Sequence, residues 1–327
     1  MLKKIKTLIK KNTRNKNAGW YKHLEKLNDK LWDIRFAEKK KHYGKENPDQ
    51  GIYIIRRRAG NVGLLSIVIV VLARLKEAEQ RGLVPVVDLM NTRNLYLEDE
   101  EVGKVNSWEY YFLQPAGISL ESAYRSKNVV LGSGEVSEDR PNDTVDLLMN
   151  VDGKLDEWKR LFKQYIHIRP ELLQKAEEEY RENVSASDKV VGVCCRGAGY
   201  RKARIKNHPI QPEVGDLIEK TKEMMKKTGC TKVYLSTEDG DIVKQFEEVF
   251  GAQLFVKQRN FFYFDEQGKA IRRDHSKRRK GEDYLLQLLL LSKCDCTVSA
   301  RCSGAVGAAL MSEGYEDAYY FDLGEYC

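Results

Sequence analysis

Residues 191–212, VGVCCRGAGYRKARIKNHPIQP, decide the fold class of this chain. The stretch begins with β-branched residues, which predict a buried strand, and continues into a loop rich in glycine and basic side chains. In α/β proteins, positive charge and free backbone N–H groups at the end of a buried strand hold phosphate. The stretch therefore predicts an α/β protein with a phosphorylated ligand.

The second half of the chain alternates between strand and helix patterns. Strands are predicted at 189–194, 232–237, 254–256 and 295–298, and helices at about 212–228, 238–250, 282–292 and from the loop at 299–304 to near Gly314. Alternation at this spacing is typical of a parallel sheet covered by helices. The basic residues 272–280 are interpreted as a loop.

The first half predicts a second unit of the same kind. We expect a charged helix over 20–47, with an apolar stripe that packs in the core, and a turn at 47–51. A strand at 52–55, a glycine loop at 57–63 and a helix ending at Gly82 should follow. Further strands are predicted at 84–88 and 128–131, and helices over 152–183. The stripe comprises Trp20, Leu24, Leu27, Leu31, Trp32 and Phe36. The polar residues 185–188 mark a domain boundary. This gives a basic, helical N-terminal segment (1–50), an N-terminal lobe (51–185) and a C-terminal lobe (186–327).

Composition excludes some classes of protein and leaves others open. The chain has 56 Lys and Arg against 49 Asp and Glu, a net charge of +7, which suits an anionic substrate, a membrane surface or nucleic acid. The longest apolar run, 64–73, is too short to span a bilayer. Seven scattered cysteines without a C-x-x-C pair indicate a reducing, cytoplasmic interior rather than a disulfide framework. Zinc is not expected, because Cys294 and Cys296 alternate along a predicted strand.

Three loops of the second half follow predicted strands and should meet at one edge of the sheet. The first carries Arg196, Gly197, Tyr200, Arg201, Lys202 and His208, the second Ser236, Thr237, Glu238 and Asp239, and the third Ser299, Arg301, Cys302, Ser303 and Gly304. An arginine fork matches phosphate oxygens, and the N–H groups at the start of the last helix add neutral donors. An acidic side chain of the second loop could accept from a sugar hydroxyl.

Simpler interpretations of these residues stay open. His208 before Pro209 could be only a turn residue, and Glu238-Asp239 is also an ordinary acidic first turn of a helix. The basic N-terminus, 1–16, fits either an amphipathic helix on an anionic membrane or a solvated terminus. The chain lacks the phosphate-loop motif G-x-x-x-x-G-K-[ST], a G-x-G-x-x-G motif after a strand, the G-x-S-x-G elbow and the H-E-x-x-H motif.

Four peptides carry a family resemblance. Residues 195–200 (CRGAGY) with 208–212 (HPIQP) resemble the arginine-containing peptide of the fucosyltransferase-like glycosyltransferases. Residues 233–239 resemble the second peptide of that superfamily, residues 291–305 the third, and residues 60–63 (GNVG) its first-lobe glycine loop. The superfamily includes core α1,6-fucosyltransferases, the nodulation fucosyltransferase and protein O-fucosyltransferases. A polysaccharide-biosynthesis branch of bacterial relatives is more similar still.

The resemblance implies a GT-B fold, with two facing Rossmann-like lobes and mainly parallel sheets. It implies an inverting, metal-independent transferase that uses no cofactor and takes GDP-fucose as co-substrate. The resemblance implies that Arg196 is catalytic and binds the β-phosphate. It points to no general base, for which His208, Asp88, Glu98 and Glu109 are our candidates from the sequence. The implied donor-binding residues are Gly60, Asn61, Gly63, Gly197, Tyr200, Thr237, Glu238, Asp239, Cys302, Ser303 and Gly304.

The chain also departs from the family pattern. Ala198-Gly199 replaces the usual Thr-Asp, Cys194 lies near the position of a base-contacting histidine, and Cys302 and Gly304 replace Ser and Gln. The leading hypothesis is a glycosyltransferase acting on a surface glycan or lipid-linked oligosaccharide, cytoplasmic and peripheral at the inner face of the plasma membrane. A catalytically inactive scaffold or nucleotide-sugar-binding subunit in polysaccharide assembly is the alternative. Nucleic-acid binding is disfavoured, because aromatic side chains do not interleave with the basic run.

Overall fold

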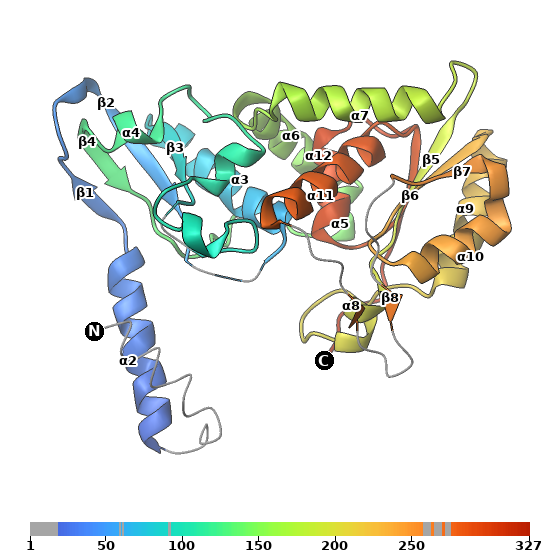
Figure 1. The fold of residues 1–327 in the computed structure, drawn as a ribbon, viewed down its shortest axis with the longest axis horizontal. Helices are drawn as coiled ribbons and strands as arrows, with labels where there is room; N and C mark the ends of the chain where they lie inside the picture. Colours follow the sequence, from blue (N-terminus) through green and yellow to red (C-terminus); the bar gives the residue numbers. More distant parts are fainter. Residues whose placement is uncertain are drawn as a thin grey trace.

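Two β-sheets form the centres of two lobes in the computed structural model, which describes residues 19–58, 60, 62–90, 93–257, 263–264, 270–271 and 276–327 (Figure 1). The first sheet has the order β1-β4-β2-β3, with β1 Lys39–Lys41, β2 Glu46–Arg56, β3 Val84–Asp88 and β4 Ser126–Leu131. The second has the order β11-β10-β5-β6-β7, with β5 Val190–Cys194, β6 Lys232–Ser236, β7 Leu254–Phe255, β10 Cys296–Ala300 and β11 Asp317–Phe321. All their pairings are parallel except that of β1 with β4, so the predicted α/β fold with mainly parallel sheets is confirmed.

Helices cover both sheets. They are α2 Gly19–Phe36, α3 Leu64–Gln80, α4 Leu120–Ala123, α5 Val145–Leu148, α6 Lys154–Tyr165, α7 Pro170–Asn183, α8 Ala198–Ala203, α9 Val214–Thr228, α10 Gly240–Phe250, α11 Lys277–Ser292 and α12 Ser303–Met311. A short antiparallel pair, β8 Tyr263–Phe264 with β9 Ala270–Ile271, lies before α11. None of the helices in the described part of the chain is both long and apolar enough to cross a membrane.

Strand β5 is buried on both faces, as its β-branched sequence predicts. Val191 and Val193 pack in one apolar cluster with α9 and α10, whereas Val190 and Cys194 belong to the cluster that contains α11. Gly192 faces α11 so closely that a Cβ atom there would lie 2.6 Å from Cδ1 of Leu291. Neighbours on both faces and on both edges therefore fix the position of the loop that follows this strand.

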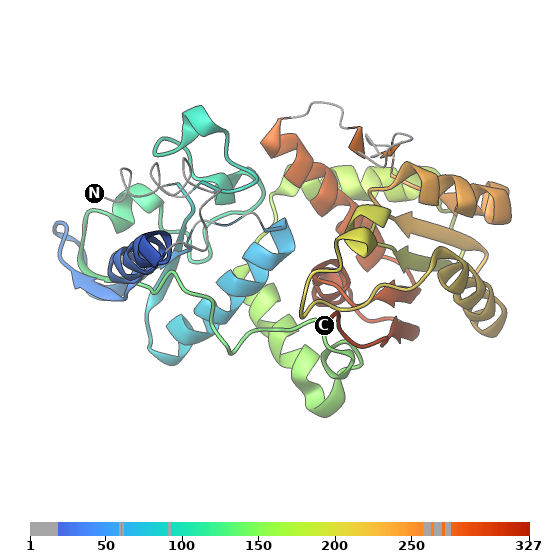
Figure 2. The ribbon, with the colours of Figure 1, turned by 90° about the horizontal axis from the view of Figure 1, so that it is seen from below.

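Helix α3 lies at the junction of the lobes and is buried along most of its length (Figure 2). It packs against α6, α11 and α12 as well as against strands β2 and β3 of its own lobe. A Cβ atom at Gly307 of α12 would lie 2.4 Å from Cδ1 of Leu65, so the side chain of Leu65 in α3 packs directly on the backbone of α12 at this point. This contact holds the N-termini of α3 and α12 close together.

The N-terminal segment differs from the sequence prediction. Helix α2 ends at Phe36 instead of near residue 47, and the segment 1–50 is not wholly helical because β1 and the start of β2 follow. The turn predicted at 47–51 lies within β2, where the register shifts between Glu46 and Gly51 and Asn47 has a positive φ of 46°. Helix α2 projects from the first lobe (Figure 1). Trp32 and Phe36 of the predicted stripe are buried, whereas Trp20 is 47% exposed.

The second half needs smaller corrections. The loop after β5 contains the short helix α8, and α11 begins at Lys277, inside the stretch interpreted as a basic loop. Cys294 precedes β10, and its thiol donates to the carbonyl of Leu290 at 3.4 Å, so it does not alternate with Cys296 along the strand. The domain boundary at 185–188 stays a prediction.

Candidate functional site

The three sequence-predicted loops meet at one edge of the second sheet. They follow β5, β6 and β10, which are neighbours in the sheet and run parallel, so their carboxyl ends lie together. The first two loops are joined by a hydrogen bond from the N–H of Gly197 to the carboxylate of Glu238 at 3.3 Å. The first strand and the third loop meet where the sulfurs of Cys194 and Cys302 lie 3.8 Å apart. The predicted convergence is therefore confirmed.

Arg196 lies at the centre of this edge. Its guanidinium stacks over the ring of Tyr200, with Cζ 4.6 Å from the ring centroid. Its Nε is buried and has no hydrogen-bond partner among the described residues. Burial alone would lower the pKa of Arg196, but Glu238 and Tyr284 outweigh it and the pKa is raised. Arg196 is thus a fixed cation with an unused donor.

The residues of the second loop are held by backbone contacts. Asp239 caps helix α10, accepting from the N–H of Asp241 at 3.1 Å, and Thr237 accepts from the N–H of Asp239 at 3.2 Å. A Cβ atom at Gly197 would lie 3.2 Å from Cβ of Asp239, so the glycine allows the first two loops to pack closely. The helix-start interpretation of Asp239 is confirmed, and Glu238 is the acidic side chain of this loop that faces Arg196.

The third loop places the N-terminus of helix α12 beside Arg196. Cys302 is the N-cap, and its sulfur accepts from the N–H of Ala305 at 3.4 Å. Gly304 lies against Tyr284 of α11, whose hydroxyl would be 3.0 Å from a Cβ atom at this position. The tyrosine hydroxyl therefore occupies space that a larger residue at 304 would need.

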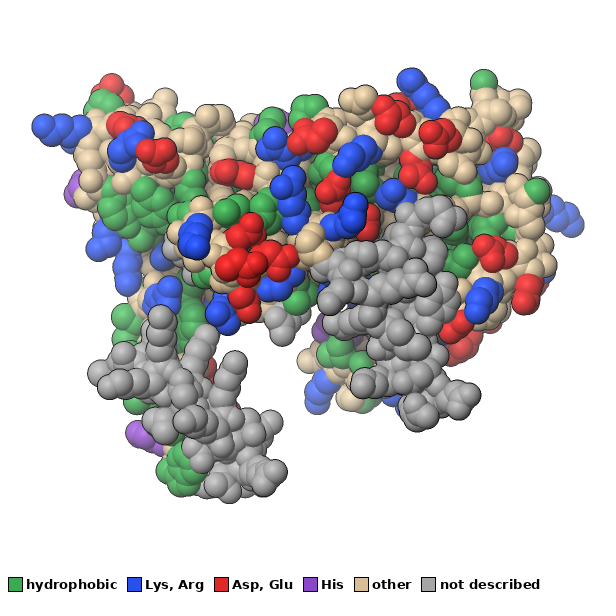
Figure 3. All heavy atoms as spheres, viewed as in Figure 1, with side chains coloured by type: hydrophobic (Ala, Val, Ile, Leu, Met, Phe, Trp, Pro, Cys, Tyr) green, Lys and Arg blue, Asp and Glu red, His purple; other side chains and the backbone are tan. Residues whose placement is uncertain are grey.

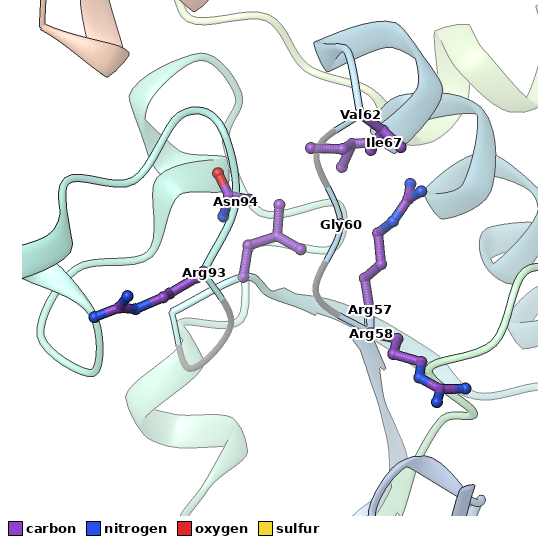
Figure 4. Close-up of a pocket in the computed structure, with 8 residues that line it drawn as sticks. Arg57, Arg58, Gly60, Val62, Ile67, Arg93 and Asn94 are labelled. Atoms are coloured by element: carbon purple, nitrogen blue, oxygen red, sulfur yellow. The ribbon is translucent and has the colours of Figure 1, made fainter. Parts of the chain in front are cut away.

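The first-lobe glycine loop lies next to the same helix N-terminus. Gly63 is the N-cap of α3, and the hydroxyls of Ser66 in α3 and Ser303 in α12 are 3.2 Å apart. A small pocket is lined by this loop, and Figure 4 shows Arg57 running alongside Gly60 toward α3. Nη1 of Arg57 donates to the carbonyl of Ser66 at 3.0 Å. Asn61, the remaining predicted residue of this loop, lies outside the described residues.

His208 is exposed and is held by Tyr200, with 2.5 Å between its Nδ1 and the tyrosine hydroxyl. The ring of Tyr200 therefore connects His208 to Arg196. Arg201 turns toward solvent-exposed Glu213 at 3.2 Å.

Other polar candidates are engaged in structural contacts. Asp88 accepts from the hydroxyl of Tyr124 at 2.6 Å, Glu98 from the N–H of Lys277 at 2.5 Å, and Glu109 from the amide of Gln114 at 2.7 Å. Arg301 is buried and donates to the carbonyl of Asp143 at 2.9 Å, while it also pairs with Asp322. The described residues contain no group of three or more His, Cys, Asp and Glu that could hold a metal ion.

Two tyrosines beside Arg196 are missing from the sequence prediction. Burial raises the pKa of Tyr96 to about 12 and that of Tyr284 well above its usual value, while Arg196 acts in the opposite direction on both. Both tyrosines therefore keep their protons and are neutral. Tyr284 follows the charged run at the start of α11, where sequence alone gives no signal for a site.

Charge is not gathered into one patch on the face shown in Figure 3. Acidic and basic side chains intermix over the part of that face that the structure describes. A nucleic-acid surface would instead show a continuous basic stripe, so nothing on this face revives that hypothesis.

No protein-family model and no curated protein matches the sequence. Among solved structures, the fold is similar to the fucosyltransferase NodZ from Bradyrhizobium, with a TM-score of 0.50 and 16% identity over 85% of this chain and 96% of that chain. A NodZ alpha-1,6-fucosyltransferase crystal soaked with GDP-fucose gives a TM-score of 0.48 and 16% identity, covering 80% of this chain and 93% of that chain. The apo form of POFUT1 gives a TM-score of 0.49 and 10% identity, covering 83% of this chain and 98% of that chain.

The likeness to NodZ at a TM-score of 0.50 shows the fold. The predicted GT-B fold class is therefore confirmed, with one α/β lobe around each of the two main sheets.

Proposed function

We propose that this protein is an inverting, metal-independent glycosyltransferase that moves a sugar from a nucleotide diphosphate donor, with GDP-fucose favoured. The acceptor we propose is a surface glycan or lipid-linked oligosaccharide. The fold, the convergence of the three loops and the resemblance of their peptides support this proposal together.

One observation carries the proposal. Arg196 presents a buried Nε without a partner among the described residues, at the carboxyl edge of a parallel sheet and beside the N-terminus of α12. Leaving a buried donor unpaired costs about 1–3 kcal/mol, and more when the group is charged. A bound anion that accepts from Nε would recover this free energy. A diphosphate suits the site because its negative charge favours both a guanidinium fork and the positive end of a helix dipole.

The proposed chemistry is electrostatic. As the bond between sugar and diphosphate breaks, negative charge grows on the β-phosphate. Arg196 would hold that charge, the positive end of the α12 dipole would stabilise it, and the hydroxyl of Ser303 would add a further donor. A fixed arginine and a helix N-terminus can supply here what a bound Mg²⁺ supplies in other transferases.

His208 is our candidate for the base that removes the acceptor proton. For this role Nδ1 must carry the ring proton and donate it to the hydroxyl of Tyr200, which leaves Nε2 free to accept. We expect His208→Ala to lower kcat by on the order of 10²-fold, the usual range for a general base. The KM for the donor should change only a few-fold, which separates a role in proton transfer from one in donor binding. A kcat of His208→Ala equal to that of the wild type would exclude His208 as the base.

The activity is tested by incubating the full chain with GDP-fucose and acceptor glycans in the presence of EDTA. We expect released GDP and a product whose anomeric configuration is opposite to that of the donor. Loss of turnover on addition of EDTA would refute metal independence, and a retained configuration would refute inversion. Nucleotide binding without turnover on any donor would favour the alternative of an inactive nucleotide-sugar-binding subunit, which the Ala198-Gly199 departure motivates.

We further propose a cytoplasmic location with peripheral contact at the inner face of the plasma membrane. The basic residues 1–16 motivate this, and they lie outside the described residues. Such a segment is attracted to anionic lipid by about 1 kcal/mol per basic residue near the surface. Sedimentation with anionic vesicles, compared between the full chain and one lacking 1–16, tests the proposal, and equal binding of both would refute it.

A further inference from the structure

Two buried thiols lie next to each other and near Arg196. Cys194 is the last residue of β5, Cys302 is the N-cap of α12, and their sulfurs are 3.8 Å apart. Their exposed fractions are 5% and 6%. The two residues lie at the ends of the neighbouring strands β5 and β10, and one leads into the arginine loop while the other begins α12.

The two sulfurs are not equivalent. Cys302 shares a hydrogen bond with Cys194, lies near Arg196 and accepts from backbone N–H groups at the start of α12, and these contacts hold its pKa below the usual value. The pKa of Cys194 is raised, because its proton is held between the two sulfurs and because it is buried. Cys302 is therefore the nucleophile, and Cys194 is a protonated thiol in contact with it.

We propose that Cys194 and Cys302 form a reversible redox pair that closes to a disulfide when the protein meets a small peroxide. In the first step the Cys302 thiolate attacks one peroxide oxygen, the O–O bond breaks, and a sulfenic acid and hydroxide form. In the second step Cys194 sulfur attacks the Cys302 sulfenic sulfur, the S–O bond breaks and water leaves with the Cys194 proton. An external dithiol reverses the reaction and is itself oxidised.

The disulfide would change the site, because a bonded sulfur pair is about 2.05 Å apart. Closing the gap from 3.8 Å pulls the end of β5 and the first turn of α12 together beside Arg196. We therefore expect the oxidised protein to bind the nucleotide-sugar donor more weakly, and only this expectation rests on the proposed function.

The chain contains a matched control pair. Cys230 interacts with Cys296, but burial raises the pKa of Cys230 to about 12, so it stays a thiol and reacts slowly. Cys195 adjoins Cys194 in sequence, and burial raises its pKa to about 12 as well. Selective oxidation at Cys194 and Cys302 therefore separates the proposal from general oxidation of buried thiols.

The test is peptide mapping of the full chain after brief hydrogen peroxide treatment and quenching. Trypsin cuts after Lys189, Arg196 and Arg301, so the cross-link joins the peptide 190–196 to the peptide that begins at Cys302. We expect this product to exceed any link between Cys230 and Cys296 by about tenfold, and to vanish with dithiothreitol. Because the second peptide also contains Cys327, both sulfurs need assignment: Cys195→Ser and Cys327→Ser should keep the cross-link, and Cys194→Ser should abolish it.

Peroxide treatment that leaves Cys302 as a thiol, or takes it to sulfinic acid without a cross-link in the wild-type protein, would overturn the proposal. The shift in melting temperature caused by GDP is then compared between reduced and oxidised protein. A cross-link with an unchanged GDP shift would refute the coupling to donor binding. Absence of a GDP shift in the reduced protein would instead count against the proposed function and leave the cross-link result standing.

Discussion

Arg196→Ala is expected to lower sugar transfer by on the order of 10²–10³-fold, the loss seen when one donor to a developing oxyanion is removed. The substitution removes the guanidinium that stacks on Tyr200 and carries the unpartnered Nε. It leaves the β5 core in place, because the side chain lies at the sheet edge beyond the strand. The measurement is kcat/KM for the donor, together with a melting curve.

Two further variants separate the causes of this loss. Arg196→Lys keeps the charge but loses the planar fork, so we expect activity between that of the wild type and Arg196→Ala. Lys206→Ala removes an exposed cation from the same basic loop and should change kcat/KM by no more than a few-fold. Equal losses in Lys206→Ala and Arg196→Ala would mean that general positive charge, and not a placed arginine, is responsible. Full activity of Arg196→Ala would remove Arg196 from the mechanism.

Gly192→Val is expected to destabilise the protein by about 3 kcal/mol, the upper range for overpacking a core. The new side chain would enter space held by Leu291 and Cys294, whose nearest atoms are 2.6 Å and 2.9 Å from an ideal Cβ. Strand β5 cannot move away, because β10 and β6 pair with both of its edges. A urea unfolding curve gives the difference in the free energy of unfolding.

Gly215 in helix α9 provides the opposite case. A Cβ atom there meets nothing within 4 Å, so Gly215→Ala should stabilise the protein by about 0.5–1 kcal/mol through helix propensity. A Gly192→Val variant as stable as the wild type would show that the β5–α11 packing is looser than described.

Patterns confined to one segment predicted much of the fold and of the site. The buried strand at 190–194 and the loops after β5, β6 and β10 follow from local sequence, and parallel strands must bring those loops to one edge. The structure of the N-terminal region is harder to predict from local sequence. The sequence Lys39–Lys41 favours helix by propensity, yet it forms an edge strand because it pairs with β4.

Contacts between distant segments account for the rest of the site. Tyr284 and Tyr96 reach Arg196 from α11 and from the first lobe, and the pairing of Cys194 with Cys302 joins residues 108 positions apart. The approach of Ser66 to Ser303 depends on how the two lobes pack. No periodicity within one segment carries this information.

The most direct measurement of the central claim is the melting temperature of the full chain, titrated with GDP in EDTA. At a concentration of 100 times the dissociation constant, binding stabilises the native state by about 2.7 kcal/mol. We expect a saturable rise of several degrees that GDP-fucose reproduces and that Arg196→Ala abolishes. Unchanged melting of the wild-type protein with GDP, GDP-fucose and other nucleoside diphosphates would contradict the account of a nucleotide-sugar site at Arg196.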